Sequence, residues 1–174
     1  MNFLILWDKQ IFDWIVMVGG NPQLQAFCEA IAKPKYLLSI AFIYWLFYFK
    51  IHKKGALLLL AAVVFNLAFG DFMVNFLKYA VGRPRPGVVL GLYYNPAAFA
   101  WPSAHAFNSM SFAILIYLWS LRRITIFIFF SFLIGMARVI SNYHFPLDVI
   151  SGWILGTFWA YLQYHVGQWF VEKR

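Results

Sequence analysis

The chain alternates long apolar runs with short polar links. A helix needs about 20 apolar residues to cross a hydrocarbon core of about 30 Å. Runs of roughly that length occupy residues 25–49, 55–80, 102–121, 124–140 and 147–170. The pattern predicts an all-α fold, a polytopic transmembrane helix bundle of about five spans, with the polar links at the two membrane faces.

Two features interrupt this pattern. Pro34 lies inside the first run, where it marks either a kink or the true start of the helix. Residues 81–101 form the longest gap between runs and are rich in glycine and proline. They are therefore expected to form a loop and not a regular spanning helix.

Ahead of the first run, apolar residues recur at helical spacing through residues 3–18. This stripe consists of Leu4, Trp7, Ile11, Trp14, Ile15 and Val18. The segment is expected to be a helix that either lies in the membrane interface or packs against the bundle. Asp8 and Lys9 lie off the stripe and, with Asp13, interrupt its apolar character, so no cleavable signal peptide is expected here.

Composition supports a membrane protein. Of the 174 residues, 63% are hydrophobic and 11% are charged, against about 25% charged in a typical soluble domain. Residues 1–174 are therefore expected to form a single integral-membrane domain. The net charge is +8, but the basic residues form no stripe between aromatics, so no nucleic-acid partner is expected. The single Cys28 forms no internal disulfide and is expected to be a small buried apolar group.

Three polar islands stand out, because ionisable groups are costly inside a membrane and usually mark a functional site. They hold Lys78 and Arg85, then Ser103 and His105, then Arg138, His144 and Asp148. Alternating spans bring all three islands to the same membrane face. One anion-binding, proton-transferring site is therefore expected there, and phosphate is the anion that fits.

The basic residues predict which way this face points, since cytoplasmic links carry an excess of lysine and arginine. The opposite face carries Lys50, Lys53, Lys54, Arg122, Arg123, Lys173 and Arg174. With the candidate site cations set aside, the face with the islands carries Lys9, Lys33, Lys35 and Arg83. The site is therefore expected to face the periplasm from a bacterial inner membrane.

The first two islands suit a phosphate and its leaving group. Lys78 supplies a point charge and Arg85 a planar fork, and the pair matches a tetrahedral dianion. Ser103 stands where a helix start offers free N–H groups, and His105 on the same turn can protonate a leaving oxygen. Taken singly, these features are equally a basic helix end that reaches the headgroups and a capped helix start.

The third island pairs a histidine with a carboxylate. Asp148 follows His144 by four residues, so it reaches one imidazole nitrogen if the segment is helical. A carboxylate there fixes the tautomer and leaves the other nitrogen available as nucleophile or base. Two alternatives stay open: Pro146 interrupts the helix, or the pair is only structural. Arg138 adds a third cation.

In order and spacing, the islands resemble the blocks of the type 2 phosphatidic acid phosphatase (PAP2) superfamily. The resemblance rests on Lys78 with Arg85-Pro86, Pro-Ser-Ala-His at 102–105, and Arg138 with His144 and Asp148. It implies a nucleophile that becomes phosphohistidine (His144), its orienting carboxylate (Asp148), a proton donor (His105), and phosphate-holding groups (Lys78, Arg85, Ser103, Ala104 and Arg138). It implies no metal and no cofactor, and the six acidic residues are scattered without a two-metal cluster.

Two residues depart from the family pattern. Ala104 stands where the family usually has glycine, and its extra methyl group changes the oxyanion contacts at most. Ala137 stands where the family usually has serine, so one hydroxyl contact to the phosphate or its neighbours is expected to be missing. Asp71 lies two helical turns before Lys78 and pairs either with a cation near the site or, as favoured here, with a hydrogen-bond partner inside the bundle.

Three other polar residues are expected to lie outside the core of the site. Arg83 is expected to contact substrate or headgroups. His52 and His165 lie toward the opposite membrane face and are expected to be unrelated to the site.

A site at the bilayer surface suits a phosphorylated lipid whose tails stay in the membrane. The candidate substrates are lipid A, phosphatidylglycerophosphate, phosphatidate and undecaprenyl pyrophosphate. The small size resembles bacterial lipid A 1-phosphatases, so lipid A 1-phosphate is favoured. Two other functions stay open: a phosphotransferase that passes phosphate to a second lipid, and a non-catalytic protein that binds or transports a lipid headgroup.

Overall fold

The computed structural model describes residues 3–92, 99–119 and 125–172, and helices dominate all three ranges. The helices are α1 (Phe3–Gly19), α2 (Pro22–Ile31), α3 (Pro34–Ile51), α4 (Lys53–Phe65), α5 (Asp71–Val81), α6 (Pro86–Val89), α7 (Ala104–Trp119), α8 (Ile126–Ile140) and α9 (Pro146–Glu172). A π-helical segment, Asn66–Gly70, joins α4 to α5. These ranges contain one isolated β-bridge and no strand, as predicted for an all-α fold.

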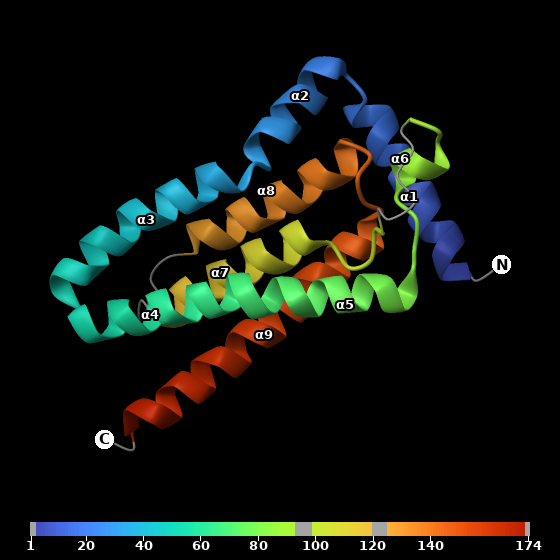
Figure 1. The fold of residues 1–174 in the computed structure, drawn as a ribbon. Coiled ribbons are helices and arrows are strands. Elements are labelled where there is room, and N and C mark those ends of the chain that lie inside the picture. The colour runs from blue at the N-terminus through green and yellow to red at the C-terminus, as the bar shows by residue number, and fades with distance from the viewer. Residues whose placement is uncertain (1–2, 93–98, 120–124, 173–174) are drawn as a thin grey trace.

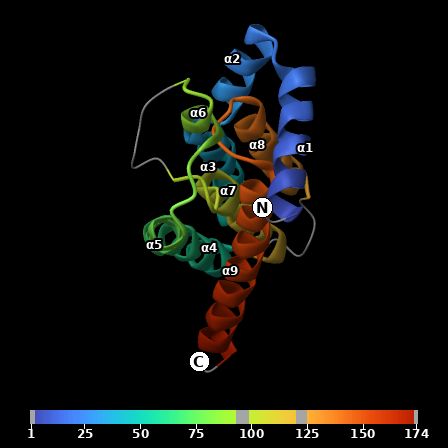
Figure 2. The ribbon, with the colours of Figure 1, turned by 90° about the vertical axis from the view of Figure 1, so that its right-hand side faces the viewer.

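The long helices run between two ends of the molecule (Figure 1). The α3–α4 hairpin turns at one end. At the other end α5 and α8 finish, α7 and α9 begin, and α1 crosses over them. Figure 2 looks onto this second end, where α1, α5, α6, α8 and the start of α9 surround α7. The termini lie far apart, with the C-terminus at the end away from α1.

The helix boundaries follow the predicted runs closely, and the structure decides between the two predicted roles of Pro34. Pro34 is the first residue of α3, so it marks a helix start and not a kink, and α2 is a separate helix. The continuous helix Lys53–Val81 is the one described helix that is both long and apolar enough to cross a membrane on its own, with a mean hydropathy of 2.2.

The N-terminal helix α1 packs against α8 and α9, which decides between the two predicted placements. It buries Phe12 and, unexpectedly, Asp8. Its opposite side exposes large apolar residues, including Trp7 and Trp14, as a helix at the membrane interface would.

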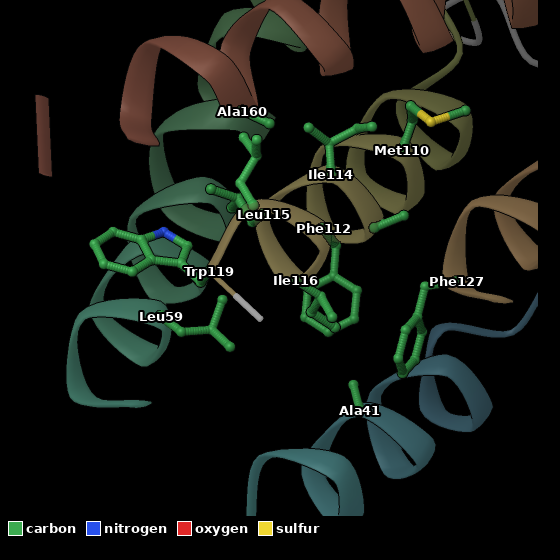
Figure 3. Packing of buried hydrophobic residues seen from close by; sticks show 12 residues of the cluster. Ala41, Leu59, Met110, Phe112, Ile114, Leu115, Ile116, Trp119, Phe127 and Ala160 are labelled. Atoms are coloured by element: carbon green, nitrogen blue, oxygen red, sulfur yellow. The ribbon is translucent and has the colours of Figure 1, made fainter. Parts of the chain in front are cut away.

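Helix α7 is the centre of the apolar core, and it is buried on nearly every side. Figure 3 shows its Leu115 between Leu59 of α4 and Ala160 of α9, and its Phe112 facing Phe127 of α8. The second half of α7, from Phe112 to Trp119, is apolar on every side and suits the middle of a bundle, because no polar face there has to meet water. The large apolar side chains that α3, α5 and α9 expose are expected to meet lipid.

Small residues bring α7 and α9 close together. A Cβ at Gly152 would lie 2.7 Å from the carbonyl oxygen of Ser103, and one at Gly156 would clash with the carbonyl oxygen of Phe107. The four-residue spacing of the two glycines puts them on one face of α9, where only backbone separates the helices. This contact fixes the start of α7 against the start of α9.

Candidate functional site

Two of the predicted cations meet at one carbonyl group. Lys78 ends α5, and Arg85 follows after the left-handed turn at Gly82. The Lys78 Nζ and the Arg85 Nε donate to the carbonyl oxygen of Phe99, at 3.1 and 3.3 Å. The Pro84–Phe99 bridge aligns the two loop strands that make this contact. The predicted pair of phosphate-holding groups therefore lies side by side.

The third cation joins them across an aromatic ring. Arg138 in the last turn of α8 lies 4.0 Å from the centroid of the Tyr143 ring, and the Arg85 guanidinium lies 5.8 Å from the same centroid. Such cation–π contacts hold a guanidinium in place without consuming all of its N–H donors. Three positive groups from α5, the α5–α6 link and α8 thus converge on one region.

His144 is placed by the way α8 ends. Asn142 adopts a left-handed conformation with φ 59°, a common way to stop a helix. The N–H groups of Tyr143 and His144 then return to the carbonyl oxygen of Arg138, at 3.1 and 3.2 Å. The turn leaves the His144 side chain 1% exposed, inside the protein and beside the three cations.

The surroundings of His144 keep its imidazole neutral. Burial lowers its pKa well below the usual 6.5, and the charges of Lys78, Arg85 and Arg138 lower it further. A hydrogen bond to the backbone of Ala100 opposes this effect but does not outweigh it. A neutral imidazole has a lone pair available, which a nucleophile or a base needs.

Asp148 lies next to His144, but its hydrogen bonds go elsewhere. Its Oδ2 is 3.8 Å from the His144 Nδ1, too long for a hydrogen bond. The carboxylate accepts from the Phe145 N–H at 2.8 Å and from the Arg83 guanidinium at 2.7 Å. Among the described residues no group hydrogen-bonds to the His144 Nδ1. His144 and Asp148 are therefore adjacent, as predicted, but no direct hydrogen bond joins their side chains.

Arg83 occupies a different place from the one expected. It does not extend toward headgroups but bridges Asp148 and Asp8, whose side chains are both fully buried, and it stacks 4.4 Å from the Phe145 ring centroid. Asp8 also accepts from the N–H of Leu147 at 2.8 Å, which caps the start of α9. Sequence reasoning missed Asp8, although a carboxylate in an apolar helix was a signal.

The start of α7 is bonded to the backbone of Asp148. The Ser103 N–H donates to the backbone carbonyl of Asp148 at 2.9 Å. The Ser103 hydroxyl is fully buried and lies 3.5 Å from the N–H of Ala106, where it caps the helix. Ala104 and His105 on the next turn are half-buried and line a cavity of about 450 Å³.

This cavity lies between the Lys53–Val81 helix and helices α7 and α8. Its polar lining includes Asn66, Asp71, Asn75, Asn108 and Ser109. The Asn108 amide donates to Asp71 at 2.5 Å, so the favoured interpretation of Asp71, a hydrogen bond inside the bundle, is confirmed. The asparagines carry no charge and were overlooked in the sequence.

The remaining singled-out residues lie outside the site. Ala137 is 1% exposed and packs with Cys28 and Ala32 of the α2 region, so this position faces α2. Cys28 is the buried small apolar group that was expected. His52 lies at the α3–α4 turn, at the end of the bundle away from the site, and His165 lies in the last turns of α9.

The assembled groups fit chemistry on a phosphate. Cations can hold the oxygens of an anion, a neutral buried imidazole can attack or accept a proton, and a second imidazole lies on the neighbouring helix start. Within the described part of the chain, no three His, Cys, Asp or Glu side chains gather as a metal site would require.

Comparisons with known proteins match this arrangement to one family. The family model of the PAP2 superfamily matches residues 57–172, which contain every predicted site residue but not Asp8. Two solved structures resemble the fold. A transmembrane PAP2-type phosphatidylglycerolphosphate phosphatase from Bacillus subtilis has a TM-score of 0.71 at 23% identity, covering 99% of this chain and 88% of that one. LpxE from Aquifex aeolicus has a TM-score of 0.61 at 24% identity, covering 89% and 93%.

Three curated relatives are similar in sequence. A lipid A 4'-phosphatase from Bacteroides thetaiotaomicron is 35% identical over 127 residues, 66% of this chain and 56% of that protein. An undecaprenyl-diphosphatase from Sulfolobus acidocaldarius is 29% identical over 123 residues, covering 68% and 58%. A lipid A 1-phosphatase from Rhizobium johnstonii is 30% identical over 110 residues, covering 59% and 45%. The chain spans about half the length of these relatives.

Proposed function

This chain belongs to the PAP2 superfamily, and we propose that it is an integral-membrane lipid phosphatase that works through a phosphohistidine. The observation that carries the proposal is the buried, neutral His144 imidazole beside the three cations Lys78, Arg85 and Arg138. Positive charge holds a phosphate dianion, and the same charge keeps the imidazole unprotonated and ready to attack it.

The reaction divides into two displacements at phosphorus. An imidazole nitrogen of His144 forms a bond to phosphorus while the bond to the lipid oxygen breaks, and His105 gives that oxygen its proton. Water then attacks the phosphohistidine, His105 takes a proton from it, and the bond to His144 breaks to release phosphate. The cations neutralise the equatorial oxygens in both steps. At the start of α7, the Ser103 hydroxyl and the Ala104 N–H add hydrogen-bond donors for the phosphate.

Asp148 orients the nucleophile, with Arg83 and Asp8 behind it. Asp148 holds the backbone N–H of Phe145, the residue after His144, and a small rotation closes the 3.8 Å gap to the imidazole. Catalytic hydrogen bonds of this kind often tighten only when substrate binds. Arg83 fixes the carboxylate from the other side and is itself fixed by Asp8 on α1. These two are positioning residues, since neither takes part in the chemical steps.

Replacing Asp8 by asparagine is expected to lower kcat about tenfold while leaving KM nearly unchanged. The change weakens a charge-assisted hydrogen bond to Arg83 and so loosens Asp148, but it leaves the phosphate-holding cations in place. Steady-state kinetics of the purified protein measure both constants. Asp13→Asn, at an exposed position of the same helix, is the matched control, and Asp8→Glu should recover part of the loss. A rise in KM at constant kcat would place Asp8 in substrate binding instead.

We place the protein in a bacterial inner membrane with the site facing the periplasm. The lysine and arginine bias between the two faces supports this orientation. Lipid A 1-phosphate is the favoured substrate, and phosphatidylglycerophosphate, phosphatidate and undecaprenyl pyrophosphate are the competing ones. Two relatives named as lipid A phosphatases support lipid A as the lipid, and one of them is named for the 1-phosphate.

The test is phosphate release by the purified protein from each of these four lipids in detergent micelles. We expect release from at least one lipid without any added metal, and persistence of that activity in a chelator. A protein that binds the lipids but releases no phosphate from any of them would be a headgroup-binding protein. Phosphate that appears on a second lipid and not in solution would identify a phosphotransferase.

A further inference from the structure

The cavity beside His105 lies along the Lys53–Val81 helix, and polar residues form one part of its lining. Asp71 lies seven residues before Lys78, which is about 10 Å farther into the membrane at about 1.5 Å per helical residue. Asn66 lies five residues deeper still. An ionisable side chain at such a depth usually faces a water-filled cavity and serves a function.

The π-helical segment brings these residues onto one face. Asn66 opens the segment and Asp71 follows it, five residues on, which is the hydrogen-bond spacing of a π turn. Asn75 and Lys78 continue from Asp71 at the usual four- and three-residue spacing of an α-helix. Asn66, Asp71 and Asn75 line the cavity and thereby connect its interior with the cations.

Helix α7 supplies the polar residues on the opposite side of the cavity, and their hydrogen bonds hold Asn66 and Asp71 in place. Asn108 donates to Asp71 at 2.5 Å and lies 3.5 Å from the amide nitrogen of Asn66. Asn66 in turn accepts from Ser111 at 2.6 Å. This network fixes the direction in which Asn108 and Asp71 present their polar atoms. Asn75 is exposed at the cavity, and no described residue hydrogen-bonds to its side chain.

We propose that this cavity receives a leaving group that carries free hydroxyls, so that the substrate is a phosphomonoester lipid of a sugar or of glycerol. A carboxylate beside carboxamides offers both acceptors and donors, as hydroxyl groups require. His105 lines the same cavity, so the group it protonates lies there. The inference rests on the proposed phosphatase function and narrows its substrate.

The same chemistry disfavours two of the competing substrates. Phosphatidate leaves a diacylglycerol whose esterified positions offer no hydroxyl besides the one just released. Undecaprenyl pyrophosphate leaves a phosphorylated chain, and its negative charge would be repelled by the Asp71 carboxylate. A site built to bind hydroxyls also discriminates strongly against analogues that lack them, because its polar groups are then left unpaired.

The experiment compares kcat/KM for four substrates in the wild type and in Asp71→Asn, Asn75→Ala and Asp13→Asn. Lipid A 1-phosphate and phosphatidylglycerophosphate carry hydroxyls on the leaving group; phosphatidate and undecaprenyl pyrophosphate do not. We expect the wild type to prefer the first pair, and the Asp71 and Asn75 variants to reduce that preference about tenfold. Asp71→Asn should also accelerate pyrophosphate hydrolysis. Asp13→Asn, outside the cavity, should leave the preference unchanged.

The possible results separate the cavity proposal from the phosphatase proposal. A preference for lipid A 1-phosphate alone would identify the leaving group as a sugar. A preference for phosphatidylglycerophosphate alone would identify it as a glycerol headgroup. Both results support the inference. Faster turnover of phosphatidate or of the pyrophosphate by the wild type overturns it while the phosphatase stands. An equal loss on all four substrates in both cavity variants overturns it as well. No release from any lipid would remove the phosphatase itself and the inference with it.

Discussion

The His144→Ala variant is expected to lose phosphate release by about 10⁴-fold or more, because it has no atom that can form the bond to phosphorus. Phosphate binding should survive, since Lys78, Arg85 and Arg138 come from other segments of the chain. Product release under saturating lipid measures the loss, and competition by inorganic phosphate or vanadate in a binding assay measures retention. His165→Ala, an exposed histidine of α9 far from the site, is the matched control and should keep full activity.

The same variant tests the covalent intermediate. Wild-type protein mixed with phosphorus-labelled substrate and denatured in base should retain label on the chain, because the phosphorus–nitrogen bond of phosphohistidine survives base. His144→Ala should retain none. Residual activity within tenfold of the wild type, or label that persists in the variant, would assign the nucleophile to another residue.

Gly156→Leu is expected to destabilise the bundle strongly. Its side chain would enter space held by the backbone of Phe107, and the helices cannot separate without opening the core around Leu115. Overpacking of this kind lowers the free energy of unfolding by about 3 kcal/mol, and by more where the clash is with backbone atoms that cannot move aside. Thermal unfolding in detergent should show a lower midpoint for Gly156→Leu and a smaller decrease for Gly156→Ala.

Ile154→Phe is the matched control for this prediction. Ile154 lies two residues earlier on α9 and is 64% exposed, so extra bulk there meets lipid and should leave the midpoint almost unchanged. Gly152→Leu should resemble Gly156→Leu and also lower activity, because the α7 start that it displaces is bonded to Asp148. A normal midpoint for Gly156→Leu would mean that α7 and α9 do not pack through their glycines.

Much of the site was accessible from the order of residues. Lys78, His105, Arg138 and His144 are ionisable groups at the ends of apolar runs, and such groups are rare enough in a membrane to be noticed one by one. Alternation of the spans then gathered them at one face without any knowledge of side-chain contacts. The fold class followed for the same reason, since a chain in lipid must satisfy its backbone within helices.

The contacts that sequence reasoning missed share one cause. They depend on how each helix is rotated about its axis and on residues that are far apart along the chain. Asp8 lies 139 residues before its partner Leu147, and no local pattern predicts such a contact. In the sequence, nothing distinguishes the three asparagines Asn66, Asn75 and Asn108 from other polar residues. The π-helical segment places Asn66 on the same face as Asn75, and both then line the cavity with Asn108. Arg83 looked like a headgroup contact because its two buried carboxylates belong to other helices.

The sequence by itself therefore determined that the chain is a helical membrane protein and that its ionisable groups gather at one end of the bundle, because these features follow from burial costs that act residue by residue. Only the tertiary structure decided which nitrogen, carboxylate and cation touch. It bonded Asp148 to Arg83 and the Phe145 backbone, left it 3.8 Å from His144, and set a cavity lined by asparagines and Asp71 beside His105. Those outcomes depend on how close helices approach at Gly152 and Gly156, a distance set by packing between segments far apart in the chain.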